Sequence, residues 1–165
     1  MLFCGFSTAQ EAQTTEEFGK KMLKSLQSND PDMMASLAYQ KDVLIETMEV
    51  QTTNEEVKAE LSRELEREGF DRKMIGEMKN AHERLQKQEY ETEKIDWAKT
   101  KFKAFKFQKN EQRTEMSGIE MGEGYLHFLY GGREYKLKMD KMAKLIVGWR
   151  GNELSGQFKL VYKNQ

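Results

Sequence analysis

Apolar residues recur at helical intervals at the beginning of the chain. Thr14 and Glu17 have the spacing of a capping box, and apolar residues then follow every four positions, at Phe18, Met22 and Leu26. Asp30 can cap a second helix, and Pro31 suits its first position because an N–H there would have no partner within the helix. The pattern therefore predicts two consecutive helices.

Three more helices are predicted before the pattern changes. Residues 42–50 are ambiguous, and we interpret them as a short helix. Thr53 and Glu56 form a second capping-box pair, which predicts a helix start. We expect Gly69 to end that helix in the left-handed conformation and Asp71 to cap the next one. The last helix has an apolar face formed by Ile75, Met78, His82 and Leu85.

Near Lys94 the apolar period changes from that of a helix to that of a strand. In residues 95–108 the alternation slips by one position near Ala104, which predicts a β-bulge. Further short strands are assigned to the segments MSGIEM, GYLHFLY, REYKLKM, KLIVGW and QFKLVY. Short strands with tight connections predict an antiparallel meander.

One hairpin can be placed from the sequence. Gly131 and Gly132 can adopt the positive φ angles of a two-residue turn, whose twist matches that of the flanking strands. Beyond the turn, apolar and basic residues alternate, with Tyr135, Leu137 and Met139 on one face and Lys136 and Lys138 on the other. The preceding run is apolar on both faces, which predicts a central strand.

Helices followed by strands define an α+β protein, with an antiparallel sheet of four to six strands. Ile95-Asp96-Trp97 stands where the apolar period changes, and Gly148 with Trp149 stands near the end of the chain. These residues and the order of the segments resemble small exported proteins of Bacteroidota that have an NTF2-like, or cystatin-like, cone fold, and the resemblance implies that the first motif opens the first long strand and the second motif starts the last. The resemblance implies a cone between helices and sheet, and many such relatives have no assigned function.

Composition indicates a single globular domain. The chain has 165 residues, of which 38% are hydrophobic and 33% charged. Residues 1–9 carry no charge and are mostly apolar, and Ser7 and Ala9 stand where a signal peptidase requires small residues. We interpret residues 1–9 as the remainder of a secretory signal and residues 10–165 as one domain. We therefore expect a bacterial protein exported to the periplasm or beyond, with no membrane span.

Charge is distributed unequally along the chain. Residues 10–93 hold 20 acidic and 12 basic side chains, a charge of −8, whereas residues 94–165 hold 8 and 15, a charge of +7. One interpretation is that the two halves attract each other within the domain. The alternative is a basic surface for an anionic partner, to which Lys99, Lys101 and Lys103 on the first strand would contribute.

No catalytic signature is found. Only His82 and His127 are histidines, no zinc-binding spacing exists, and Cys4 falls in the predicted signal. We expect His82 to be packed with one hydrogen bond. We expect neither catalytic residues, nor a metal, nor a cofactor. An enzyme of the ketosteroid isomerase type, with Asp140 as its carboxylate, would rest on analogy of fold alone.

The sequence favours a non-enzymatic protein that binds a small or peptide-like ligand between helices and sheet. Five large residues with a polar edge are the candidate ligand-binding residues: Trp97, Tyr125, His127, Tyr135 and Trp149. Two alternatives remain, an NTF2-like enzyme acting on a small apolar molecule and a basic-sheet module that binds an anionic polymer. The partner is a small molecule, a protein or a second copy in a homodimer, and nucleic acid is not expected.

Overall fold

The computed structural model describes residues 13–162, so the predicted signal in residues 1–9 lies outside the described part. Helix α1 (Thr15–Gln27) begins with the predicted capping box, in which the Glu17 N–H donates to Thr14 Oγ1 and the Thr14 N–H to Glu17 Oε2. Helix α2 (Pro31–Ala35) is capped by Asp30, whose Oδ1 accepts from the Met33 N–H. Both predicted helix starts are confirmed.

The next three helices form with shifted ends. They are α3 (Lys41–Gln51), α4 (Glu55–Leu65) and α5 (Phe70–Lys87). The predicted cap at Thr53 is wrong, because Asn54 Oδ1 accepts the first free N–H groups of α4. Gly69 is left-handed, with φ of 76°, but it directly precedes α5 instead of ending α4. Asp71 does not cap α5 either; it lies in the first turn and accepts from the Lys41 N–H.

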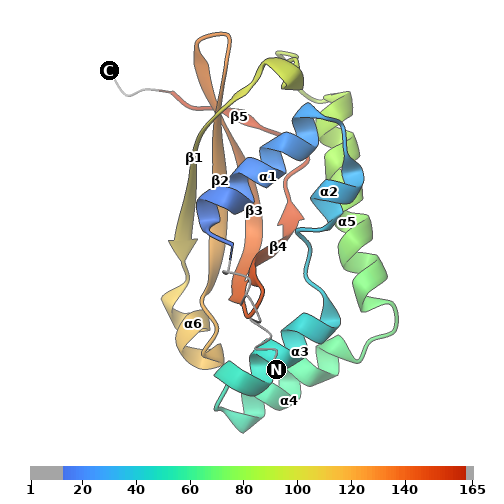
Figure 1. The fold of residues 1–165 in the computed structure, drawn as a ribbon, viewed down its shortest axis with the longest axis vertical. Coiled ribbons are helices and arrows are strands. Elements are labelled where there is room, and N and C mark those ends of the chain that lie inside the picture. The colour runs from blue at the N-terminus through green and yellow to red at the C-terminus, as the bar shows by residue number, and fades with distance from the viewer. Residues whose placement is uncertain (1–12, 163–165) are drawn as a thin grey trace, which may run out of the picture.

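An antiparallel sheet follows the helices, which confirms the α+β class (Figure 1). After a short 3-10 helix, η1 (Trp97–Lys99), the sheet runs in the order β1-β2-β3-β4, with β5 paired to β3 beyond the end of β4. The strands are β1 (Lys101–Lys109), β2 (Met121–Tyr130), β3 (Arg133–Leu145), β4 (Gly148–Leu154) and β5 (Lys159–Leu160). Strand β2 is central, as predicted.

Two local predictions for the sheet are confirmed. The register between β1 and β2 shifts between Phe102 and Ala104, which is the predicted bulge. Gly131 and Gly132 join β2 to β3 with φ angles of 57° and 75°. An ordinary L-residue would be strained at both positions.

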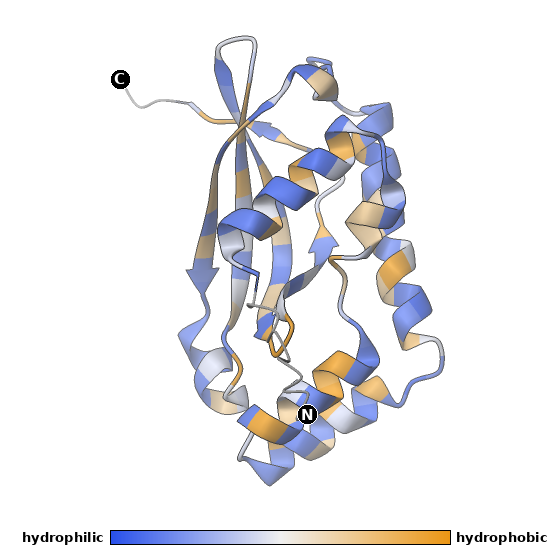
Figure 2. Ribbon diagram, viewed as in Figure 1, coloured by the Kyte–Doolittle hydropathy of each residue, from blue (hydrophilic) through white to orange (hydrophobic). Residues whose placement is uncertain are grey.

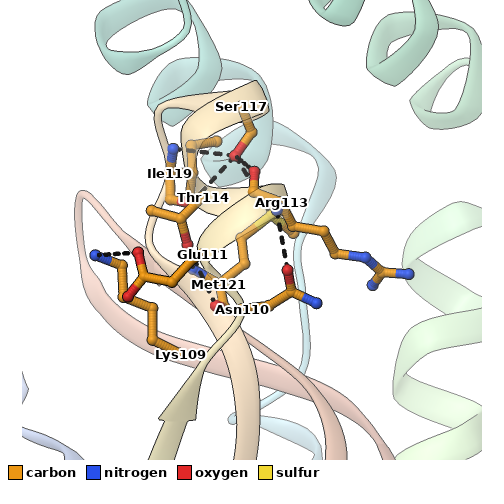
Figure 3. Close-up of polar contacts among 8 residues, drawn as sticks. All are labelled: Lys109, Asn110, Glu111, Arg113, Thr114, Ser117, Ile119 and Met121. Atoms are coloured by element: carbon orange, nitrogen blue, oxygen red, sulfur yellow. Dashed lines mark hydrogen bonds and ion pairs between the residues drawn. The ribbon is translucent and has the colours of Figure 1, made fainter.

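Three of the predicted strands differ from the structure. Part of the segment MSGIEM lies in helix α6 (Glu111–Ser117), where Asn110 Oδ1 accepts from the Arg113 N–H (Figure 3). After the helix, the Ile119 N–H donates to Ser117 Oγ and the Met121 N–H donates to Thr114 Oγ1. These two hydrogen bonds fix the connection from α6 to β2. The segment KLIVGW spans the turn between β3 and β4, and QFKLVY contains only the two residues of β5.

The core lies between the sheet and helices α1, α2 and α5, which cover one of its faces (Figure 1). Hydrophobic bands alternate with hydrophilic ones along these elements (Figure 2). The largest side chains with almost no exposed surface are Phe18, Phe128, Met22, Leu23, Leu26, Met34, Leu37, Met78, Leu85, Leu126, Leu137 and Met139. These side chains fill the space between helices and sheet where the cone was expected.

Candidate functional site

Three of the five predicted ligand-binding residues are part of the core. The Trp97 ring packs against Phe128 and Phe158, with centroids 5.2 and 5.6 Å apart, and its Nε1–H donates to the Leu85 carbonyl oxygen. Trp149 packs on Phe107 at 4.5 Å. Both tryptophans therefore have a structural role in packing the core.

Tyr135 also lies on the helix side of the sheet. Its ring stacks on Phe128 at 5.7 Å and is buried, but its hydroxyl reaches the rim and donates to Glu93 Oε2 at 3.0 Å. Glu93 also accepts from Arg133, and this hydrogen bond is the main cause of its lowered pKa. Tyr135 thus joins the hairpin to the segment that follows α5.

Tyr125 and His127 lie on the opposite face of the sheet. They alternate along β2 with Leu126 and Phe128, which are core residues, so their side chains project away from the helices. His127 Nδ1 is 2.8 Å from Glu134 Oε1, and the Tyr125 hydroxyl donates to Glu123 Oε2. The five residues therefore do not line one cavity, because they divide between two faces of the sheet.

His82 has the expected structural role. It is 2% exposed on α5, and its Nε2 lies 3.0 Å from the Ser25 carbonyl oxygen on α1. This contact joins two helices inside the core.

An open groove lies along the seam between α5 and the sheet. It has a volume of about 440 Å³ and is formed by α5, β3, β4 and the segment after β4. We call it the α5–β4 groove, and its lining residues are Glu77, Asn80, Arg84, Asp140, Glu153, Leu154, Ser155 and Gly156. Sequence reasoning did not find it, because its helix residues belong to a polar face that looks like any solvated helix surface.

The carboxylates of the groove are paired and accessible. Glu77, Asp140 and Glu153 each have a lysine neighbour, at 4.0, 2.7 and 2.8 Å respectively. Their side chains are 38%, 48% and 47% exposed. All three carboxylates are therefore accessible to a ligand that enters the groove.

Glu77 is held in place by the sheet. The Asn152 Nδ2–H donates to Glu77 Oε2 at 2.6 Å, and Asn152 itself is 3% exposed. The next residue on β4, Glu153, has a φ of 55°, which is uncommon outside glycine. The left-handed backbone and the buried amide together fix the groove wall formed by β4.

Arg84 is the charged group of the groove without an ion pair among residues 13–162. It packs on Gly156, where an added Cβ would come within 2.7 Å of Arg84 Nε. Arg84 and Gly156 also line a smaller hollow of about 100 Å³, which extends to the exposed Tyr90. The two hollows therefore meet at one guanidinium group.

The side chains and helices of the described part of the chain bear on metal binding and on membrane insertion. In residues 13–162, no three histidine, cysteine, aspartate or glutamate side chains come close enough to hold a metal ion. No described helix is both long and apolar enough to cross a membrane.

The comparisons with known proteins give one structural likeness. No protein-family model matches the chain, and no curated protein sequence matches it. The fold is similar to that of a cystatin-like protein from Ruminococcus gnavus ATCC 29149, with a TM-score of 0.49 and 16% sequence identity. The match covers 88% of this chain but only 44% of the other, so the chain spans less than half the length of that protein.

Proposed function

We propose that the protein is an exported, non-enzymatic binding protein that holds a small or peptide-like ligand in the α5–β4 groove. The single observation that carries the proposal is the Arg84 guanidinium, which has no ion-pair partner among residues 13–162 and lies where two hollows meet. A guanidinium presents several N–H donors in a plane and binds carboxylates through two hydrogen bonds.

The groove favours a ligand that carries both an amino and a carboxyl group. Arg84 would bind the carboxylate, and the carboxylates of Glu77, Asp140 and Glu153 face the same space and would accept from an ammonium group. Leu154 is the only apolar residue of the lining, so an apolar ligand would find little surface to cover. Amino acids and short peptides have the required groups.

The test is a ligand screen on the purified protein. We expect native mass spectrometry or a thermal-shift screen of amino acids and dipeptides to detect a bound zwitterion. Arg84→Gln should weaken its binding by about tenfold or more, because a charge-assisted, bidentate contact is lost. Arg72→Gln, an exposed arginine on the same helix outside the groove, is the matched control.

Gly156→Ala tests the groove without removing a charge. The new methyl group would displace the Arg84 side chain, so ligand affinity should fall while the fold remains intact. Unchanged affinity in both Arg84→Gln and Gly156→Ala would contradict the assignment of the site.

The export part of the proposal rests on residues 1–9 alone. Their apolar character and the small residues Ser7 and Ala9 support cleavage before Gln10. N-terminal sequencing of the protein from its native cell should give a chain that begins at or near Gln10. An intact Met1 on cytoplasmic protein would refute export and leave the groove unaffected.

A further inference from the structure

The sheet face opposite the helices has an unusual charge arrangement. Its side chains come from β1, β2, β3 and β5, and we call it the outer sheet face: Lys101, Lys103, Lys106, Glu123, Tyr125, His127, Glu134, Lys136, Lys138 and Lys159. Every formally cationic group in this set is a lysine. The carboxylates are fewer, so the face has an excess of positive charge.

Two rows of this face run across the strands. In one, Lys159 of β5 pairs with Lys136 of β3, which pairs with His127 of β2. In the other, Lys138 pairs with Tyr125, which pairs with Lys106 of β1. Like charges directly opposite each other destabilise a sheet, so the Lys136–Lys159 pair opposes folding. Such a violation of local rules is expected where a surface serves function.

Only some of these lysines are neutralised. Lys103 pairs with Glu134, and Lys138 pairs with Glu123 and Asp140. Lys101, Lys106, Lys136 and Lys159 form no ion pair with any carboxylate of residues 13–162. Lysine on an edge strand can serve to prevent aggregation, but Lys136 lies on β3, which has neighbours on both sides.

The two halves of the chain also do not neutralise each other by direct contact. Among the described residues, Arg133–Glu93 alone joins the basic half to the acidic half, and every other ion pair lies within one half. The attraction between halves that the sequence suggested therefore provides no ion-pair partner for Lys106, Lys136 or Lys159. Their field is directed outward and attracts anions.

We propose that the outer sheet face binds a linear acidic polysaccharide, with Lys106, Lys136 and Lys159 as its main contacts. Neighbouring strands lie roughly 4.8 Å apart, so these ammonium groups follow one another at intervals of about one or two strands. A chain with regularly spaced carboxylate or sulfate groups can contact them in succession. The binding energy then comes largely from release of counterions.

The same residues favour a polysaccharide over a nucleic acid. Tyr125 is the aromatic residue of this face, and the Lys136 and Lys138 Nζ atoms lie 5.8 and 5.9 Å from its ring centroid. The ring is thus occupied by cations instead of being open for a base to stack on it. Arginine, the residue best suited to phosphate, is not part of the face. Glu123 and Glu134 can accept hydrogen bonds from the free hydroxyl groups of a sugar chain, which the backbone of single-stranded DNA does not offer.

The experiment measures binding of the full-length protein to four polymers of similar length at low salt: polygalacturonate, heparin, neutral dextran and a single-stranded oligothymidylate. We expect polygalacturonate or heparin to bind, dextran not to bind, and affinity to fall steeply as salt rises. A preference between the first two distinguishes carboxylated from sulfated chains. Tighter binding of the oligothymidylate would overturn the proposal in favour of nucleic acid.

Matched variants locate the site. The triple variant K106Q/K136Q/K159Q should lose about tenfold or more in affinity. The control K20Q/K79Q/K87Q removes the same charge from ion-paired lysines on helices, and it should retain the affinity of the parent protein. The face variant should fold, because Lys136→Gln also removes a like-charge contact. Equal losses in the two variants, or no binding of any acidic polysaccharide, would refute the proposal.

Discussion

The two faces of strand β2 differ in what holds their side chains. Leu126 and Phe128 face the helices, have no exposed surface and belong to the main hydrophobic cluster of the core. Tyr125 and His127 alternate with them on the same strand, but their polar atoms bond to carboxylates of the outer sheet face. One strand thus combines a face packed in the apolar core with a face whose polar side chains are held by carboxylates, and substitutions should separate the two.

The largest expected effect is on the inner face. Phe128→Ala removes a ring that contacts Trp97, Tyr135 and Phe158, and we expect the free energy of unfolding to fall by about 3–5 kcal/mol. Tyr125→Ala, an aromatic truncation on the outer face, should cost about 1 kcal/mol or less. Urea denaturation of both variants checks the difference, and equal losses would show that the faces do not differ energetically.

Overpacking gives the next largest effect. An added Cβ at Gly124, on the inner face of β2, would lie 2.5 Å from Phe105 Cζ and against the Met142 sulfur. We expect Gly124→Ala to lower the free energy of unfolding by about 1–3 kcal/mol. Gly76→Ala on α5 is the control, since no atom lies within 4 Å there and alanine is the better helix former. That variant should be stabilised, and a loss of stability would contradict the packing argument.

A substitution in the hairpin that joins β2 to β3 should lower stability only through the backbone φ angle. Gly131 and Gly132 have positive φ, and no atom lies within 4 Å of a Cβ added to either. Valine at either position should cost about 1–2 kcal/mol, visible as a lower thermal midpoint. Asparagine tolerates the left-handed conformation, so Gly131→Asn should have a much smaller effect. Equal losses for valine and asparagine would point to a cause other than φ.

The smallest effect concerns the outer face and depends on pH. The hydrogen bond from Lys103, followed by that from His127, lowers the pKa of Glu134. Because its folded pKa lies below the unfolded value of about 4.3, the stabilisation is complete above that pH and disappears as pH falls through the folded pKa. Glu134→Gln should cost about 1 kcal/mol at neutral pH and progressively less below about pH 4. Urea denaturation of the parent protein and the variant at neutral pH and at about pH 3 checks this, and an equal loss at both pH values would contradict the assignment.

The features that the sequence predicted correctly are those that a few adjacent residues determine. The capping box at Thr14, the bulge near Ala104 and the two glycines of the hairpin each follow from a few adjacent positions, and the structure confirms all three. The cap at Thr53 was wrong because Asn54, one residue later, offers a competing side-chain acceptor. Helix α6 was missed because its seven residues have too little apolar periodicity to be distinguished from a strand.

The candidate binding site could not be predicted, because it is formed by residues that are far apart in the sequence. Alternation showed that Tyr125 and His127 share a face, but which face the helices cover is decided by long-range packing. The groove could not be found either, because Arg84 and Gly156 are 72 positions apart in sequence and meet only through the docking of α5 on β4. Neither residue belongs to a short sequence motif that would mark it as part of a groove.

The separation of charge between helices and sheet makes the molecule an electric dipole. Its sequence gives a net charge of −1 and an isoelectric point near 6.2, from which one would expect no retention on a cation exchanger at neutral pH. A molecule that turns its lysine face toward the support should nevertheless be retained. The same orientation on an acidic polymer would point the acidic helices outward, so a polymer coated by this protein would still display negative charge at its surface.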